Sequence, residues 1–149
     1  MQILVPKWIV IHHSLTPDGS TLSWDNIHSY HTNVKGWSDI GYQAGIEQVD
    51  EGFVCMFGRP DVLAGAHTRG YNSRSFGFCF VGNFDLRAPG RPRLREAARR
   101  VLAPWCHRYS LTVDQIKPHY EFVSHKTCPG KMFDMQLLKT IVQEEIDAI

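Results

Sequence analysis

The sequence predicts a single α/β domain in which a central mixed β-sheet is flanked by helices. Three observations support this fold class. Apolar runs of strand length are interspersed with amphipathic segments, two of these runs are joined by a hairpin turn signal, and no repeat or linker divides the chain. A chain of 149 residues can bury a core without structural disulfides or metal. We therefore expect residues 1–149 to form one domain.

Four apolar runs have the length of strands. The run from Trp8 to Ile11 is continuous and rich in β-branched residues, which is typical of a strand buried on both faces. The turn signal Asp50-Glu-Gly52 separates runs 42–49 and 53–57 and predicts an antiparallel hairpin. The run 75–82 contains glycines, which indicate a bulge or a close approach of backbone. We expect it to be a central strand.

Three segments carry apolar residues at helical spacing. The first lies between Ser23, a candidate capping residue, and Gly36, which ends it. The second runs from residue 93 to about 109, where Pro104 predicts a kink or a break one turn upstream. The third begins at Phe133 and carries one apolar stripe with acidic residues outside, which predicts a packed terminal helix.

Composition and charge exclude several classes of partner. A formal net charge of +1, with 43% hydrophobic and 21% charged residues, gives no electrostatic argument for nucleic acid or an anionic membrane. No apolar run approaches the length that spans a bilayer. The first eleven residues lack a basic leader, a long apolar core and a cleavage site. We therefore expect a monomer made in the cytoplasm without a signal peptide. Five arginines between residues 91 and 100 are expected to form a solvated helix face.

The four cysteines are too dispersed for a disulfide scaffold. Cys55, Cys79 and Cys106 lie in strand-like or helical segments and are expected to be small buried apolar residues. Cys128 differs, because it lies in a loop directly before Pro129-Gly130, a turn signal.

The loop from His119 to Gly130 is the most informative part of the chain, because it contains histidines, a lysine and Cys128. Together with His12 and His13 at the end of the first strand, it predicts a split zinc site with His12, His119 and Cys128 as ligands. Imidazole and thiolate are ligands that zinc prefers, and three protein ligands leave the fourth tetrahedral position for water. An open position indicates catalysis.

Other ligand sets remain open at this point. His13 can replace His12, and either His125 or His67 can replace His119. Strand alternation sends His12 and His13 to opposite faces of the sheet, so that only one of them reaches a given site. His67 lies in a glycine-rich loop, where it either lines a substrate cleft or is a surface histidine.

Six short motifs, in one order along nearly the whole chain, resemble the zinc amidase family that contains amidase-type phage lysozymes and peptidoglycan recognition proteins. Each motif alone is weakly specific, whereas six in order are strongly specific. The motifs are Ile9-Val-Ile-His-His-Ser-Leu-Thr16, Gly36-Trp-Ser-Asp-Ile-Gly-Tyr42, Ala64-Gly-Ala-His67, Gly70-Tyr-Asn-Ser-Arg-Ser-Phe-Gly77, Val81-Gly82, and the loop from His119 to Gly130.

The resemblance implies a family fold, a zinc cofactor (Zn2+) and a reaction. By motif, the family's zinc ligands map to His12, His119 and Cys128, and its catalytic tyrosine and lysine map to Tyr42 and Lys126. The implied reaction is hydrolysis of the amide between the lactyl group of N-acetylmuramic acid and L-alanine in peptidoglycan. Zinc lowers the pKa of water from about 15.7 to about 7 and polarises the carbonyl. Tyr42 would orient that water or relay its proton, and Lys126 would stabilise the oxyanion.

One departure from the family concerns the spacing within the loop. The interval from His119 to Cys128 is one residue longer than in the phage lysozymes, which leaves open whether Lys126 or His125 points at the carbonyl. Trp37 and Tyr71 lie in glycine-containing loops. We consider them, with His67 and His125, as candidates for contacting the glycan or the peptide stem, although aromatic loop residues more often serve in packing.

The resemblance implies a phage or prophage endolysin consisting of the catalytic domain alone, which reaches the cell wall after a membrane lesion releases it. One alternative is a non-catalytic module that binds muropeptide or a protein partner, since some relatives are pure binders and some phage lysozymes also bind and inhibit an RNA polymerase. Another is a cytosolic amidase that recycles muropeptides, but in those enzymes an aspartate replaces the cysteine ligand, so Cys128 argues against it. A zinc deacetylase or protease is a weaker alternative, and the absence of His-Glu-x-x-His disfavours the commonest protease design.

Overall fold

The computed structural model describes residues 2–16 and 24–149. These residues contain a five-stranded sheet in the order β3-β2-β4-β1-β5. Strand β1 runs parallel to both β4 and β5, β2 runs parallel to β4, and β2 and β3 form an antiparallel hairpin. The predicted mixed sheet is therefore confirmed. The strands are β1 (Trp8–His13), β2 (Ala44–Val49), β3 (Gly52–Phe57), β4 (Ser75–Phe80) and β5 (Ile116–Pro118).

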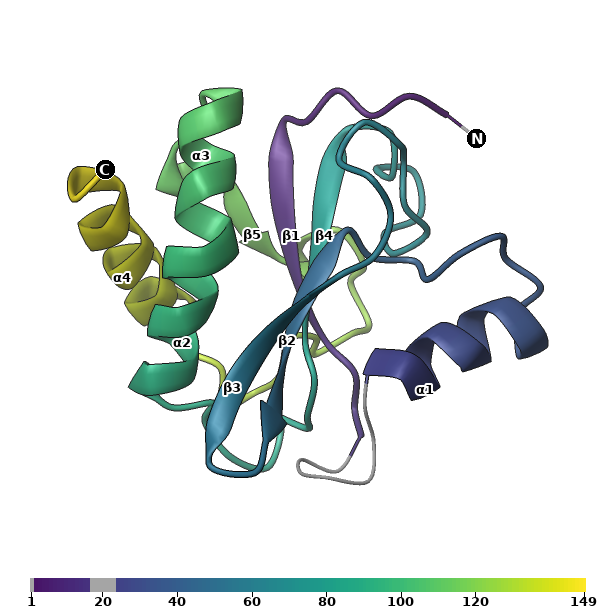
Figure 1. Ribbon diagram of the computed structural model, residues 1–149, viewed down its shortest axis with the longest axis horizontal. Coiled ribbons are helices and arrows are strands. Elements are labelled where there is room, and N and C mark those ends of the chain that lie inside the picture. The colour runs from purple at the N-terminus through teal and green to yellow at the C-terminus, as the bar shows by residue number, and fades with distance from the viewer. Residues whose placement is uncertain (1, 17–23) are drawn as a thin grey trace.

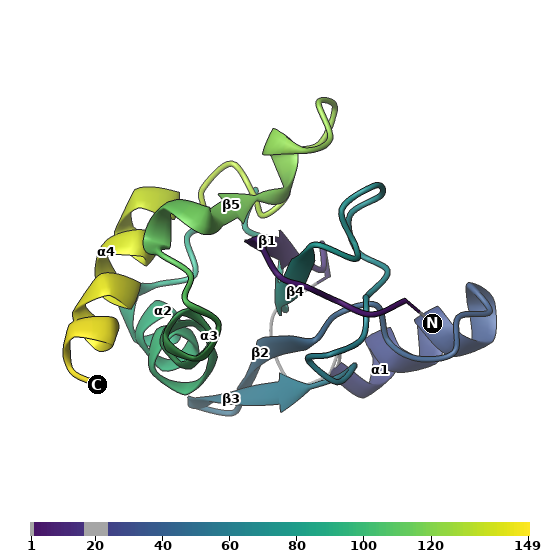
Figure 2. The same ribbon diagram turned by 90° about the horizontal axis from the view of Figure 1, so that it is seen from above.

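Helices cover both faces of the sheet. Figure 1 shows α2, α3 and α4 gathered on one face, and Figure 2 shows α1 on the other. A π-helical turn at Tyr30–Val34 continues α1, and the positive φ of Gly36, 74°, ends the segment as predicted. Ser23, the candidate cap, lies outside the described residues. The helices are α1 (Trp24–Ser29), α2 (Arg91–Ala97), α3 (Ala103–Tyr109) and α4 (Met135–Asp147).

Pro104 does not break the second helical run. It lies in the first turn of α3, and the five residues Ala98–Leu102 immediately before α3 form a π-helical turn. Proline has no N–H to donate to the carbonyl four residues upstream, and its ring crowds that carbonyl. The wider π-helical turn accommodates both effects. The disturbance therefore falls one turn upstream of Pro104, as expected, but the helical run continues.

The larger core lies between the sheet and the layer formed by α2, α3 and α4. Alternate residues of β1, Ile9 and Ile11, belong to it, together with Phe76, Phe78 and Phe80 of β4. A smaller cluster beneath α1 is built around Trp24, Ile40, Cys79 and Val81. All four cysteines are free. Among the described residues, no helix combines the length and the apolar character needed to cross a bilayer.

The arginines between residues 91 and 100 are only partly a solvated face. Arg95 pairs with Glu144 and Glu145 of α4, at 2.9 and 3.1 Å. Arg93 corrects the expectation, because it is buried. Its guanidinium packs over the rings of Phe53 and Phe84 and donates a hydrogen bond to a main-chain carbonyl. Aromatic faces and a carbonyl acceptor offset part of the cost of burying this charge.

Candidate metal centre and its cleft

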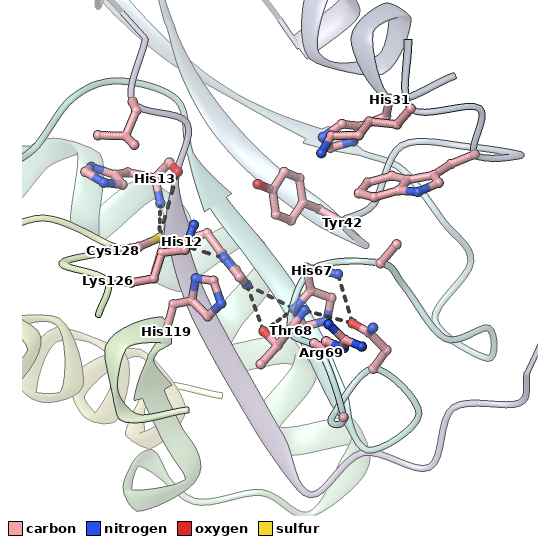
Figure 3. Close-up of a pocket in the computed structure, with 16 residues that line it drawn as sticks. His12, His13, His31, Tyr42, His67, Thr68, Arg69, His119, Lys126 and Cys128 are labelled. Atoms are coloured by element: carbon pink, nitrogen blue, oxygen red, sulfur yellow. Dashed lines mark hydrogen bonds between the residues drawn. The ribbon is translucent and has the colours of Figure 1, made fainter. Parts of the chain in front are cut away.

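Two histidines meet at one edge of the sheet because of how β1 and β5 pair. His12 lies near the C-terminal end of β1, and His119 follows β5 directly, as the first residue of a 3₁₀ turn. The parallel register places Ile11 opposite Pro118, so the next residue of each strand lies beside the other. The two imidazole centroids are 4.3 Å apart. Figure 3 shows both rings facing the same pocket.

Cys128 completes a cluster of metal-ligating side chains. Its Sγ lies 3.8 Å from Nδ1 of His12, and one ligand atom from each of His12, His119 and Cys128 lies within 4.8 Å of the others. The backbone N–H of His13 donates a hydrogen bond to the same sulfur at 3.2 Å. The predicted ligand set is therefore brought together from two distant parts of the chain, β1 and the loop from His119 to Gly130.

The loop that carries Cys128 is tied to the segment after β4. The Asp85 carboxylate accepts hydrogen bonds from the backbone N–H of Lys131, at 2.8 Å, and from the hydroxyl of Thr127, at 3.2 Å. Gly130 packs so closely that a Cβ at this position would lie 2.4 Å from the carbonyl of Phe84. These contacts flank Cys128 on both sides in the sequence, and they fix the direction of its sulfur.

His13 is directed away from this cluster, as strand alternation predicts. Its Nδ1 accepts a hydrogen bond from the backbone N–H of Phe84, and its ring stacks on the ring of Phe84. His13 therefore contributes its backbone N–H to the site rather than its side chain. Of the two neighbouring histidines, His12 is the one whose ring lies beside His119 and Cys128.

The cluster fits a zinc ion. Zinc–nitrogen and zinc–sulfur bonds of about 2.0–2.3 Å in a tetrahedron place neighbouring ligand atoms about 3.5 Å apart. The 3.8 Å separation of His12 Nδ1 and Cys128 Sγ is close to this value. Two imidazoles and one thiolate also form a donor set that zinc prefers, with one position left toward the cleft.

Burial sets the protonation of the three candidate ligands. It lowers the pKa of His12 well below 6.5 and that of His119 to about 4, so both rings are neutral and can act as ligands. It raises the pKa of the Cys128 thiol to about 12 in the metal-free protein. A metal ion bound to the sulfur therefore has to displace a proton.

The cluster opens into a cleft of about 510 Å³. Lys35, Arg69 and Lys126 line it, and no carboxylate does so among the described residues. His31 and Trp37 form another part of the wall, with their ring centroids 4.6 Å apart. The cleft is therefore positively charged and aromatic on one side, next to the candidate metal position.

The structure brings Tyr42 and Lys126 into the cleft wall. The ring of Tyr42 lies 5.2 Å from that of His12, and Figure 3 shows it across the pocket from the cluster. Burial raises the pKa of Tyr42 well above 10, so the phenol keeps its proton at neutral pH. Lys126 lines the cleft, whereas the neighbouring His125 is exposed and is not among the lining residues.

The four tentative substrate contacts have different positions. Trp37 and His67 line the cleft. Tyr71 is outside the lining, because its ring packs against Phe122 at 4.5 Å and beneath the guanidinium of Arg74. His67 does not join the ligand cluster. Its Nδ1 lies 2.9 Å from Nε2 of His12, on the edge of the His12 ring that faces away from Cys128.

Sequence reasoning did not single out His31. Its ring is buried, and its Nδ1 accepts a hydrogen bond from the backbone N–H of Gly41 at 2.9 Å. The only signal was a polar residue four positions after Ile27, on the apolar face of the first helix. Helical spacing alone does not distinguish such a residue from ordinary packing.

Two histidines and a cysteine at one end of the sheet, beside an open cleft, form a candidate metal site of the kind that metal hydrolases use. Residues 3–131 match the N-acetylmuramoyl-L-alanine amidase family, and the chain belongs to that family. The resemblance inferred from the six motifs is thereby confirmed.

The relatives include viral, animal and bacterial proteins. The chain is 31% identical over 132 residues to the endolysin of Escherichia phage T7, covering 86% of this chain and 82% of that protein. It is 30% identical over 145 residues to a mouse N-acetylmuramoyl-L-alanine amidase, covering 89% of this chain but only 26% of that protein. The chain thus spans about a quarter of the length of the mammalian relatives it matches. The structure of the amidase LysC from Clostridium intestinale superimposes with a TM-score of 0.80 at 26% identity, covering 96% of this chain and 91% of that one.

Proposed function

We propose that this protein hydrolyses the amide bond between N-acetylmuramic acid and L-alanine in bacterial peptidoglycan, with zinc as its cofactor. The observation that carries the proposal is the complete set of His12, His119 and Cys128 beside an open cleft. Membership of the amidase family supports the substrate class. A complete ligand set favours hydrolysis over binding alone, because a pure recognition site has no need of a metal.

Each residue of the site has a task in this reaction. Zinc held by the three ligands would supply a nucleophilic water at neutral pH and polarise the scissile carbonyl. The protonated phenol of Tyr42 orients the attacking water through a hydrogen bond. Lys126 lines the cleft, and its ammonium group stabilises the negative charge that develops on the carbonyl oxygen. Lys35 and Arg69 attract a peptide stem, which carries carboxylates.

A release assay on purified peptidoglycan tests the proposal. The metal-free protein and the zinc-reloaded protein are incubated with sacculi, and mass spectrometry searches for free stem peptides that begin with L-alanine beside intact glycan strands. We expect release only with zinc. Cys128→Ala should abolish both zinc binding and release, whereas Cys106→Ala, which alters a buried cysteine of α3, should retain both.

Other outcomes of the same assay identify the alternatives. Binding to sacculi without cleavage by the zinc-loaded protein would indicate a recognition module. Cleavage of soluble muropeptides but not of sacculi would indicate a recycling amidase. Release of stems in a demonstrably metal-free protein would contradict the zinc mechanism.

We further propose that the protein acts as a phage or prophage endolysin, made in the cytoplasm and released to the cell wall during lysis. Similarity to the T7 endolysin over 82% of that protein's length supports this role. Expression in the bacterial cytoplasm should leave growth unaffected until the membrane is permeabilised, after which the culture should clear. The Cys128→Ala protein, expressed to the same level, should not clear it.

A further inference from the structure

We infer that His67 is a positioning residue for the metal ligand His12. A hydrogen-bonded chain from the carbonyl of Ser75 through His67 holds His12 in the tautomer that offers Nδ1 to a metal. The inference rests on the proposed function only in requiring that the cluster binds zinc.

The His67 ring packs against two glycines, Gly65 and Gly77, at positions where a larger residue would collide with it. A Cβ at Gly77 of β4 would lie 2.6 Å from both Cγ and Cδ2 of this ring, and a Cβ at Gly65 would lie 2.8 Å from the same Cδ2. The Oδ1 atom of Asn72 accepts the backbone N–H groups of His67 and Thr68, at 2.8 and 2.9 Å. The ring is thus held by a fixed backbone turn, in space that only glycine leaves open.

The orientation of the His67 ring determines which nitrogen carries its proton. Its Nε2 lies 3.3 Å from the carbonyl oxygen of Ser75, and a carbonyl can only accept a hydrogen bond. Nε2 is therefore the protonated nitrogen. A neutral imidazole has one N–H, so Nδ1 of His67 has a free lone pair and acts as an acceptor.

The acceptor on His67 then determines the tautomer of His12. Nε2 of His12 lies 2.9 Å from Nδ1 of His67, and two lone pairs would repel each other at this distance. Nε2 of His12 must therefore carry the proton and donate it, which leaves the lone pair on Nδ1. That atom is the one that faces the sulfur of Cys128 at 3.8 Å. Figure 3 shows the chain of contacts running from Cys128 through His12 to His67.

This arrangement differs from the usual support of a metal-bound histidine. Such a ligand generally donates its second N–H to a carboxylate, a carbonyl or water. Here a neutral histidine stands between His12 and the carbonyl, so the support adds no negative charge to the site. A carboxylate would make the site more negative, and would be repelled by the thiolate of Cys128.

Thr68 is the other polar group near Nε2 of His12. Its hydroxyl oxygen lies 3.4 Å from that nitrogen and 2.9 Å from Nδ1 of His67. A hydroxyl can donate or accept, so it is compatible with either tautomer of His12. Thr68 therefore does not select the tautomer, and it serves as the control for the assignment.

The first test reads the tautomer directly. Two-bond ¹⁵N–¹H correlation spectra of the metal-free protein at neutral pH distinguish a protonated from an unprotonated ring nitrogen. We expect His12 to be protonated at Nε2 in the wild type and in Thr68→Val, and to lose this preference in His67→Phe. A wild-type His12 protonated at Nδ1 would overturn the inference.

The second test measures zinc affinity by competition with a chromophoric chelator. Removing the support of a ligand typically weakens metal binding by about 10- to 100-fold, and we expect this loss in His67→Phe. His67→Asn places an amide oxygen near the position of Nδ1, so it should recover most of the affinity. Equal zinc affinity in the wild type and His67→Phe would contradict the inference. So would an equal loss of zinc affinity in His67→Phe and His67→Asn, provided that circular dichroism shows both variants to be folded.

Both readouts are independent of hydrolysis. If the wild type binds zinc, loses affinity in His67→Phe and yet cleaves no peptidoglycan, the positioning role stands and the proposed function fails. If the protein cleaves peptidoglycan but His67→Phe binds zinc as tightly as the wild type, the proposed function stands and the positioning role of His67 fails.

Discussion

The backbone N–H of His13 donates a hydrogen bond to the sulfur of Cys128 across 3.2 Å, although 115 positions separate the two residues. The donor belongs to the strand that also carries the candidate ligand His12. The sulfur is thereby anchored to the rigid centre of the sheet rather than to its own loop alone. An N–H directed at sulfur also stabilises the thiolate form, which zinc requires.

Asp85 attaches the loop that carries Cys128 to the segment after β4, and a substitution tests this attachment. Asp85→Ala removes the acceptor for Lys131 N–H and for the Thr127 hydroxyl, so the Cys128 loop should become more mobile. We expect weaker zinc binding, by about tenfold if one charge-assisted hydrogen bond of roughly 1.5 kcal/mol is lost. Chelator competition measures the change. Asp61→Ala, which removes an acceptor for Tyr109 outside the cleft, should bind zinc normally.

Tyr42→Phe should separate catalysis from metal binding. The change removes only the hydroxyl, while the ring still packs beside His12. Zinc affinity should be unchanged, and turnover on purified peptidoglycan should fall by about 10²- to 10⁴-fold, as for loss of a proton-transfer or water-orienting group. Tyr109→Phe, a change outside the cleft, is the matched control and should be fully active. Full activity in Tyr42→Phe would remove Tyr42 from the mechanism.

Lys126 and His125 can be distinguished in the same assay. Lys126 lines the cleft and His125 does not, so Lys126→Met should lower turnover by about 10²- to 10³-fold, the usual effect of losing one oxyanion donor. His125→Gln should have little effect. The zinc affinities of Lys126→Met and His125→Gln should be similar. A greater loss in His125→Gln than in Lys126→Met would assign the oxyanion to His125.

Gly77→Ala tests the space reserved for His67. The added methyl group would lie 2.6 Å from the ring, so either the ring or the strand must shift. Overpacking of this kind costs typically about 1–3 kcal/mol of unfolding free energy, and displacement of His67 should also weaken zinc binding. Gly52→Ala is the control, because its Cβ would have only one neighbour, at 3.8 Å. Urea unfolding of both variants measures the difference, and equal stabilities would contradict the prediction.

The metal-free protein should lose stability as the pH falls below about 6.5. Burial lowers the pKa of His12 below its ordinary value, that of His119 to about 4 and that of His67 to about 3, so the unfolded chain binds more protons than the folded one in this range. Each histidine contributes a slope of up to about 1.4 kcal/mol per pH unit.

Unfolding free energies at pH 7, 6 and 5 in the presence of a chelator test this sign. The slope should be shallower in His67→Phe, which lacks one of the three buried rings. A stability that stays constant from pH 7 to pH 5 would show that these rings are accessible to protons in the folded state.

The sequence alone determined most of the elements, though not the short strand β5 (Ile116–Pro118), and indicated the chemistry of the site. Local periodicity and turn residues identify the strands, the hairpin and the terminal helix, because each depends on contacts within a few residues. Alternation along β1 placed His12 and His13 on opposite faces. The residue types and the ordered motifs predicted His12, His119 and Cys128 as a zinc ligand set and indicated the family.

The tertiary structure decided which side chains meet and which edge of each ring faces the metal position. The pairing of β1 with β5 brings His119 beside His12, and packing directs Lys126 into the cleft while it places Tyr71 against Phe122. The place of His67 behind His12 depends on glycines in two separate segments. Such contacts join residues that are distant along the chain, so they follow from the packing of the whole sheet rather than from any local pattern.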